Sequence, residues 1–180
     1  MSILAVATLY LLGFYANDLL FSNLEHHRGA HWIFLPAGLR LLGILLLGSI
    51  GAIGIFLGSL VASLIMSQAT PLELIVESLI SAGAPLLTYF AALRYGLSVN
   101  LKNLNAKLLF LLATFFAAAS ALMHSIWYAT QGVAESFATS VLAMFVGNLL
   151  GTIIVLYVIR AGLIFAGDRW KRSKKQSKFE

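Results

Sequence analysis

Six residues on otherwise apolar segments have side chains that could bind a polar ligand, an ion or a partner: Asp18, Arg40, Glu73, Glu77, His124 and Asn148. An ionisable side chain costs about 2.5 to 3.5 kcal/mol at the centre of a lipid-spanning helix on insertion scales. Such groups therefore usually face a partner or a water-filled cavity rather than lipid. We treat these six residues as the candidate ligand or coupling site.

Several of these residues have a structural interpretation as well. Segment 70–73, Thr-Pro-Leu-Glu, has the spacing of a capping box, which predicts that Glu73 binds free backbone N–H groups at a helix start. Glu77 lies one turn further on, and its most economical partner is Arg40, because a buried charge is tolerated mainly when it is paired. A structural ion pair and a ligand site remain alternatives for these two. For His124 the alternative to a ligand site is a hydrogen bond between helices.

Three histidines, His26, His27 and His31, raise a metal hypothesis because imidazole is the commonest metal ligand. Glu25 is adjacent, but no nearby Asp, Cys or fourth His completes a closed site. We interpret the segment as an interfacial loop in which Trp32 lies at the headgroup level. The sequence predicts neither a metal nor another cofactor.

The composition indicates which elements must position these residues. Of the side chains, 60% are apolar and only 11% are charged, and the mean hydropathy is +0.91. Soluble domains carry roughly 25% charged residues, and the apolar runs here approach the roughly 20 residues that cross a bilayer. The sequence predicts an all-α, polytopic transmembrane helical bundle. It contains no G-x-S-x-G or H-E-x-x-H motif, so we do not expect an enzyme.

About six membrane spans are predicted within a transmembrane domain of residues 1–167: 2–21, 34–48, 52–66, 72–94, 106–128 and 137–160. The second and third spans are short, and as a single tilted helix they would give five spans. Pro36 suits a helix start, and glycines at 48, 51, 54 and 58 weaken a single long helix. We therefore expect a hairpin.

Basic residues set the predicted orientation, because short cytoplasmic loops are enriched in Lys and Arg. Arg94, Lys102 and Lys107 surround the loop after the fourth span. Placing this loop in the cytoplasm puts both termini there, and puts residues 22–33, 67–71 and 129–136 on the opposite side. The first segment lacks a basic n-region, so we expect a retained helix rather than a signal peptide. The predicted location is the inner (plasma) membrane, as a multi-pass protein.

Residues 168–180 form a basic tail, which we expect to lie in the cytoplasm. It contains six basic residues, Arg169, Lys171, Arg172, Lys174, Lys175 and Lys178, against two acids. Such a cluster after an apolar helix attracts anionic lipid headgroups, and no motif supports a nucleic-acid partner. The twenty residues after Arg160 are too few for an output domain with its own core. We therefore expect output through contacts with a membrane or cytoplasmic protein partner.

Two pairs of glycines four residues apart, Gly54 with Gly58 and Gly147 with Gly151, predict close helix packing. Asn148 lies within the second pair, and its amide should find a partner on another helix. Each pair therefore marks a helix face that we expect to contact another helix rather than lipid.

Segment 32–39, Trp-Ile-Phe-Leu-Pro-Ala-Gly-Leu, resembles the W-x-P-A-G opening of bacterial integral membrane-associated sensor domains. These multi-helix modules are found ahead of histidine kinases and diguanylate cyclases. Segments 56–60 and 147–151 are also similar to that family, although Asn148 replaces its late acid, turn 48–51 is not basic, and no output enzyme follows.

The resemblance implies a stand-alone, non-enzymatic sensory or scaffold module. Such a module would bind a small-molecule ligand or a partner protein through its helical bundle. The alternative is a small-solute transport component that resembles the substrate-binding subunit of an energy-coupling-factor transporter.

Overall fold

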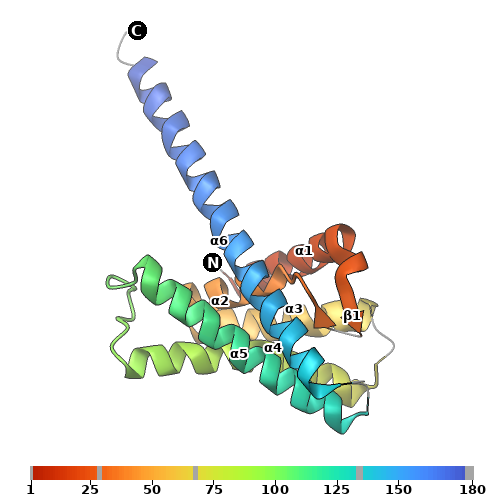
Figure 1. Ribbon diagram of the computed structural model, residues 1–180. Coiled ribbons are helices and arrows are strands. Elements are labelled where there is room, and N and C mark those ends of the chain that lie inside the picture. The colour runs from red at the N-terminus through yellow and green to blue at the C-terminus, as the bar shows by residue number, and fades with distance from the viewer. Residues whose placement is uncertain (1, 28–29, 67–68, 133–135, 177–180) are drawn as a thin grey trace.

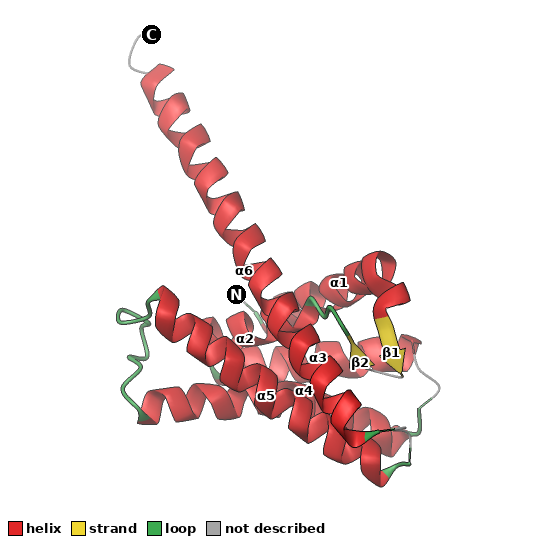
Figure 2. Ribbon diagram, in the orientation of Figure 1, coloured by secondary structure: helices red, strands yellow, loops and turns green. Residues whose placement is uncertain are grey.

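The computed structural model describes residues 2–27, 30–66, 69–132 and 136–176. Its helices are α1 (Ile3–Phe21), α2 (Pro36–Leu47), α3 (Ser49–Met66), α4 (Pro71–Arg94), α5 (Ala106–Thr130) and α6 (Phe137–Gln176) (Figure 1). After α1 come a 3-10 turn, η1 (Ser22–Leu24), and a two-stranded antiparallel ribbon of β1 (Glu25–His27) and β2 (Ala30–His31) (Figure 2). The predicted all-α helical bundle is confirmed, and the ribbon lies in the segment that was predicted as a loop.

Local sequence signals explain where the helices begin and end. The Thr70 side chain accepts a hydrogen bond from the Glu73 N–H at 3.4 Å, and Glu73 Oε2 accepts one from the Thr70 N–H at 2.7 Å. This is the predicted capping box at the start of α4. Gly48 has a φ of +54°, which side-chain-bearing residues rarely adopt, and it separates α2 from α3. The two helices pack against each other, as a hairpin requires.

Five of the described helices are long and apolar enough to cross a bilayer, and α2 is not among them. Its 12 residues span about 18 Å at 1.5 Å per residue, less than the roughly 30 Å of hydrocarbon. The prediction of about six spans, with five possible, corresponds to five full-length helices and one half-length helix. The sixth helix continues beyond its predicted end at 160, to Gln176. The chain is a multi-pass membrane protein.

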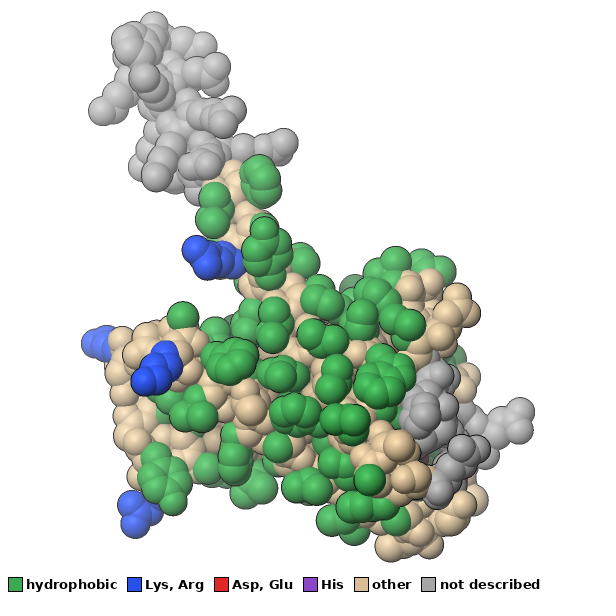
Figure 3. Space-filling model, viewed as in Figure 1, with side chains coloured by type: hydrophobic (Ala, Val, Ile, Leu, Met, Phe, Trp, Pro, Cys, Tyr) green, Lys and Arg blue, Asp and Glu red, His purple; other side chains and the backbone are tan. Residues whose placement is uncertain are grey.

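Apolar side chains cover the outside of the bundle, and polar ones lie inside it. Leu19 is 84% exposed and Phe165 is 73% exposed, whereas Asn17, Arg40 and Thr152 are all at most 5% exposed. Figure 3 shows apolar side chains over most of the visible face, with basic ones at one end and on α6. This distribution is the reverse of that in a water-soluble protein and suits a lipid surface.

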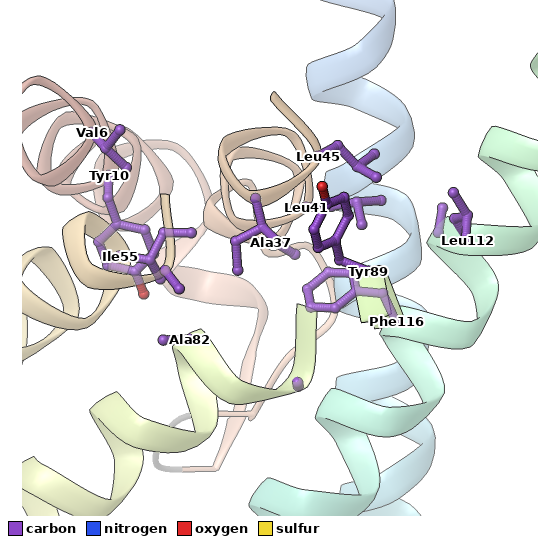
Figure 4. Packing of buried hydrophobic residues seen from close by; sticks show 14 of the residues in the cluster. Val6, Tyr10, Ala37, Leu41, Leu45, Ile55, Ala82, Tyr89, Leu112 and Phe116 are labelled. Atoms are coloured by element: carbon purple, nitrogen blue, oxygen red, sulfur yellow. The ribbon is translucent and has the colours of Figure 1, made fainter. Parts of the chain in front are cut away.

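The half-length helix α2 lies at the centre of the bundle and contacts all five other helices. Ala37 and Leu41 are fully buried on it. Figure 4 shows them between Ile55 of α3 on one side and Phe116 of α5 on the other. Most of α2, including Arg40, is therefore shielded from lipid by its neighbours, and Leu46 is the strongly exposed exception at 65%.

Candidate functional site

A non-helical segment, residues 31–35, leads into α2 and lies against α6. A Cβ atom added to Gly147 would meet the carbonyl oxygen of His31, and one added to Gly151 would meet that of Phe34. The Phe34 N–H also donates a hydrogen bond to the Gly147 carbonyl at 3.1 Å. The glycine pattern predicted a helix as the partner, and the structure places the backbone of this non-helical segment there instead. Backbone that is not helical needs such protein cover in a lipid environment, because its polar groups must be satisfied.

The other glycine pair follows the sequence prediction. A Cβ atom at Gly54 would meet Val6, and one at Gly58 would meet the Ala7 carbonyl oxygen at 2.9 Å. Glycine therefore allows α3 to approach α1 closely at two successive turns.

Asn17 of α1 also holds segment 31–35 in place. Its side chain is 2% exposed, and Oδ1 accepts a hydrogen bond from the Leu35 N–H at 2.8 Å. The start of α2 is thus attached to α1 through Asn17 and to α6 through Gly147. Sequence reasoning did not select Asn17 as a site residue, although an amide next to Asp18 in an apolar helix was a usable signal.

A cavity of about 210 Å³ lies beside this segment, and all six helices contribute to its wall. It is smaller than the roughly 300 to 1,000 Å³ of typical drug-sized sites and corresponds to about seven water molecules at roughly 30 Å³ each. Five of the six candidate residues line it: Asp18, Arg40, Glu77, His124 and Asn148. Glu73 does not line it and belongs to the capping box of α4.

Arg40 is the most unusual group in this cavity. It is 4% exposed, and its guanidinium carbon lies 4.8 Å from the ring centre of Phe34 and 5.8 Å from that of Tyr10. Its Nε and Nη1 atoms have no hydrogen-bond partner among the described residues. A buried guanidinium with unused donors is unfavourable until an acceptor arrives, and its planar fork matches a carboxylate. Arg40 is therefore arranged to receive an anionic group.

His124 lies on α5, one turn after Ser120, and both residues line the cavity. Its Nδ1 atom lies 2.9 Å from the Ser120 carbonyl oxygen and 3.5 Å from the Ser120 hydroxyl oxygen. The carbonyl can only accept, so this contact assigns a proton to Nδ1. The Nδ1 contact is within one helix rather than between helices.

The wall from α4 contains Glu77 and, one turn later, Ser81. Pro85 lies a further turn along the same helix and has no N–H group. It therefore cannot donate the usual helical hydrogen bond to the Ser81 carbonyl oxygen. The α4 wall contributes the carboxylate residue Glu77 and the hydroxyl residue Ser81 to the cavity.

The remaining candidates from the sequence are the histidines of segment 26–31 and the basic residues of the tail, and most of their side chains lie outside the described part of the chain. His31 lines the cavity and stacks on Phe34 with a centroid distance of 5.5 Å. The side chains of His26 and His27 lie outside the described part of the chain, as do those of Arg169, Lys171, Arg172, Lys174 and Lys175 and the whole of Lys178. Within the described ranges, no group of three His, Cys, Asp or Glu residues could hold a metal ion.

Sequence reasoning missed the aromatic and hydroxyl residues of the wall, of which Tyr10, Phe34, Ser120 and Tyr128 are examples. The spacing of four between Ser120 and His124 indicates a shared helix face and was an available signal. No such local signal exists for Tyr10 and Phe34, which approach Arg40 from separate elements. No protein-family model, no curated protein and no solved structure matches this chain.

Proposed function

We propose that this protein is a non-enzymatic membrane sensory module, of the kind that its segment 32–39 resembles. In this proposal it binds a small ligand in the cavity around Arg40 and passes the signal to a partner protein by contact. The observation that carries the proposal is the connection between cavity and α6. His31 and Phe34 line the cavity, and their carbonyl groups lie against Gly147 and Gly151 of that helix.

The connection supports a simple coupling mechanism. A ligand in the cavity changes the space that is open to the Phe34 and His31 side chains, and the segment that carries them packs on α6 without intervening side chains. Close-packed interfaces favour discrete arrangements over gradual deformation, so a small displacement becomes a shift of the helix. A ligand shifts this equilibrium only by its difference in affinity for the two arrangements. Because α6 is continuous to Gln176, the shift extends to the basic tail.

The same proposal places the protein in the inner membrane with both termini in the cytoplasm. Arg94, Lys102 and Lys107 lie at or near the facing ends of α4 and α5, the side that the tail would share. Basic residues near an anionic surface contribute about 1 kcal/mol each, so lipid headgroups and a partner protein are both contacts for the tail.

Cross-linking in native membranes tests this function. Photo-reactive residues at positions 168–178 should give discrete protein adducts. The adduct pattern should change when the cavity is filled by Ala62→Leu, because Ala62 is a buried cavity residue. The matched control is Val61→Leu, because Val61 is 39% exposed on the same helix. Adducts with lipid alone, or a pattern identical in both variants, would reject the proposal.

A small-solute transport component is the second candidate, and the enclosure of a polar cavity by all six helices favours it. Solute flux separates the two functions. Transport predicts that a bound radiolabelled solute crosses the membrane of intact cells, whereas sensing predicts binding without net movement.

A further inference from the structure

We propose that the ligand of this cavity is a small zwitterion, with its carboxylate at Arg40 and its ammonium group at the wall formed by Glu77 and Asp18. This inference rests on the proposed ligand-binding function and specifies the chemical class of the ligand. It concerns molecules of the size of a short-chain amino acid.

The carboxylate end is built around Arg40 of α2. Arg40 is buried with two nitrogen atoms that lack partners among the described residues, and the rings of Tyr10 and Phe34 lie beside its guanidinium group. The first turn of α2 does not line the cavity, and its Ala37 and Gly38 N–H groups donate to the Phe34 and Leu35 carbonyl oxygens at 3.1 Å. The guanidinium group is therefore the part of α2 that receives the carboxylate, and its planar fork matches the two carboxylate oxygens.

The ammonium end is built by α4 and α1. Glu77 and Asp18 supply carboxylates to the cavity lining. Carboxylate oxygens are acceptors for the N–H groups of an ammonium ion. The two ends lie on different helices and face one small cavity.

The formal charge of the lining decides between an anion and a zwitterion. Histidines aside, one guanidinium and two carboxylates line the cavity, so the formal charges sum to 1 − 2 = −1. A simple anion at Arg40 would increase this negative charge. A ligand with its own ammonium group brings an acceptor to Arg40 without adding net negative charge to the cavity. The volume of about 210 Å³ suits a ligand of the size of a short-chain amino acid.

Thermal unfolding of the purified full chain, followed by tryptophan fluorescence, tests this inference with defined probes. Glycine, alanine and β-alanine should raise the Tm in a concentration-dependent way, since a ligand that binds only the folded state stabilises it. Acetate and methylamine, which each carry half of the zwitterion, should have much weaker effects at the same concentrations. Equal stabilisation by acetate and alanine would overturn the role of the ammonium group.

Single substitutions test whether alanine binds in the cavity around Arg40. Glu77→Gln and Asp18→Asn should weaken alanine binding by at least about tenfold, whereas Glu73→Gln, outside the cavity, should leave it unchanged. Arg40→Lys should also weaken binding, because lysine keeps the charge and loses the planar fork. If Arg40→Lys fails to fold, Asp18→Asn still tests the site, because Asp18 is exposed and its replacement is conservative. Equal loss in the Glu73 and Glu77 variants would overturn the assignment.

The failure of this inference can be distinguished from failure of the proposed function. If none of the three zwitterions shifts the Tm, the zwitterion assignment is wrong. Adducts from the tail that still respond to Ala62→Leu would then show that the sensory function survives with a ligand of another class.

Discussion

Two parts of α6, residues 137–156 and 157–166, have similar apolar character and different surroundings. In the first part, small and polar residues are buried, including Ser140, Ala143, Asn148 and Thr152. In the second part, Tyr157, Leu163 and Phe165 are 72%, 69% and 73% exposed, and Figure 1 shows the helix leaving the bundle. The comparison teaches that apolar sequence does not indicate burial in a membrane protein. Small residues mark contact with protein, and large apolar residues mark contact with lipid.

If protein contacts the first part of α6 and lipid surrounds the second, the two ends of this helix should lie on opposite sides of the membrane. Labelling of introduced cysteines tests this expectation with an all-or-none result. The chain has no cysteine, so single cysteines can be introduced without background. Residues 98–105 and 170–180 should react only after the membrane is opened, whereas residues 129–136 should react in intact cells. Labelling of 98–105 and 170–180 from different sides would contradict the predicted topology.

The largest energetic contrast along α6 should come from glycine substitutions in the two parts. Gly151→Ala places a Cβ atom against the Phe34 carbonyl, and overpacking of this kind costs about 1 to 3 kcal/mol. Gly162→Ala is the matched control, since a Cβ atom there meets nothing within 4 Å, and its effect should stay within about 0.5 kcal/mol. Reversible unfolding in mixed micelles measures both. Similar losses at the two positions would remove the distinction between the two parts.

A double-mutant cycle tests whether charged residues inside the bundle interact with each other. Arg40 and Glu77 line one cavity with opposite charges, so replacing both with apolar residues of similar size should cost less than the sum of the two single replacements. We expect a coupling energy of about 0.5 to 3 kcal/mol. The control pair is Arg40 with Glu73, which lies outside the cavity and should show no coupling. Additive losses for Arg40 and Glu77 in unfolding experiments would exclude direct contact.

The smallest effect is expected where α6 faces lipid. Leu163→Ala removes a side chain that is 69% exposed and leaves no internal cavity, so stability should change by less than about 0.5 kcal/mol. Leu41→Ala is the buried counterpart, with 0% exposure, and should cost about 2 to 5 kcal/mol. A large loss at Leu163 in the same unfolding assay would mean that protein covers this part of α6.

The sequence was sufficient where structure depends on local signals. Thr70 and Glu73 predict the start of α4, and Gly48 predicts the break between α2 and α3, because caps and positive φ angles involve only neighbouring residues. The sequence was insufficient at Phe34 and Leu35, which were predicted as helix. Their N–H groups bind Gly147 and Asn17, and no local pattern specifies those distant acceptors.

In the candidate site, too, some features were predictable from the sequence and others depend on contacts between distant residues. Charged and polar residues on apolar helices were recognisable, and five of the six line one cavity. The rings of Tyr10 and Phe34 beside Arg40 were not predictable, because their approach depends on how each element is rotated about its axis. Rotation is set by packing among all six helices rather than by any one of them.

The hydrogen bond from the Phe34 N–H to the Gly147 carbonyl also has a consequence for synthesis of the chain. The two residues are 147 − 34 = 113 positions apart. At about 5 to 20 residues per second, a ribosome makes Gly147 roughly 6 to 23 s after Phe34. During this interval the half-length α2 and its non-helical lead-in have no α6 to cover them, and lipid cannot satisfy their backbone groups. The central helix of the bundle is therefore made early and reaches its final place only after the last helix has been inserted.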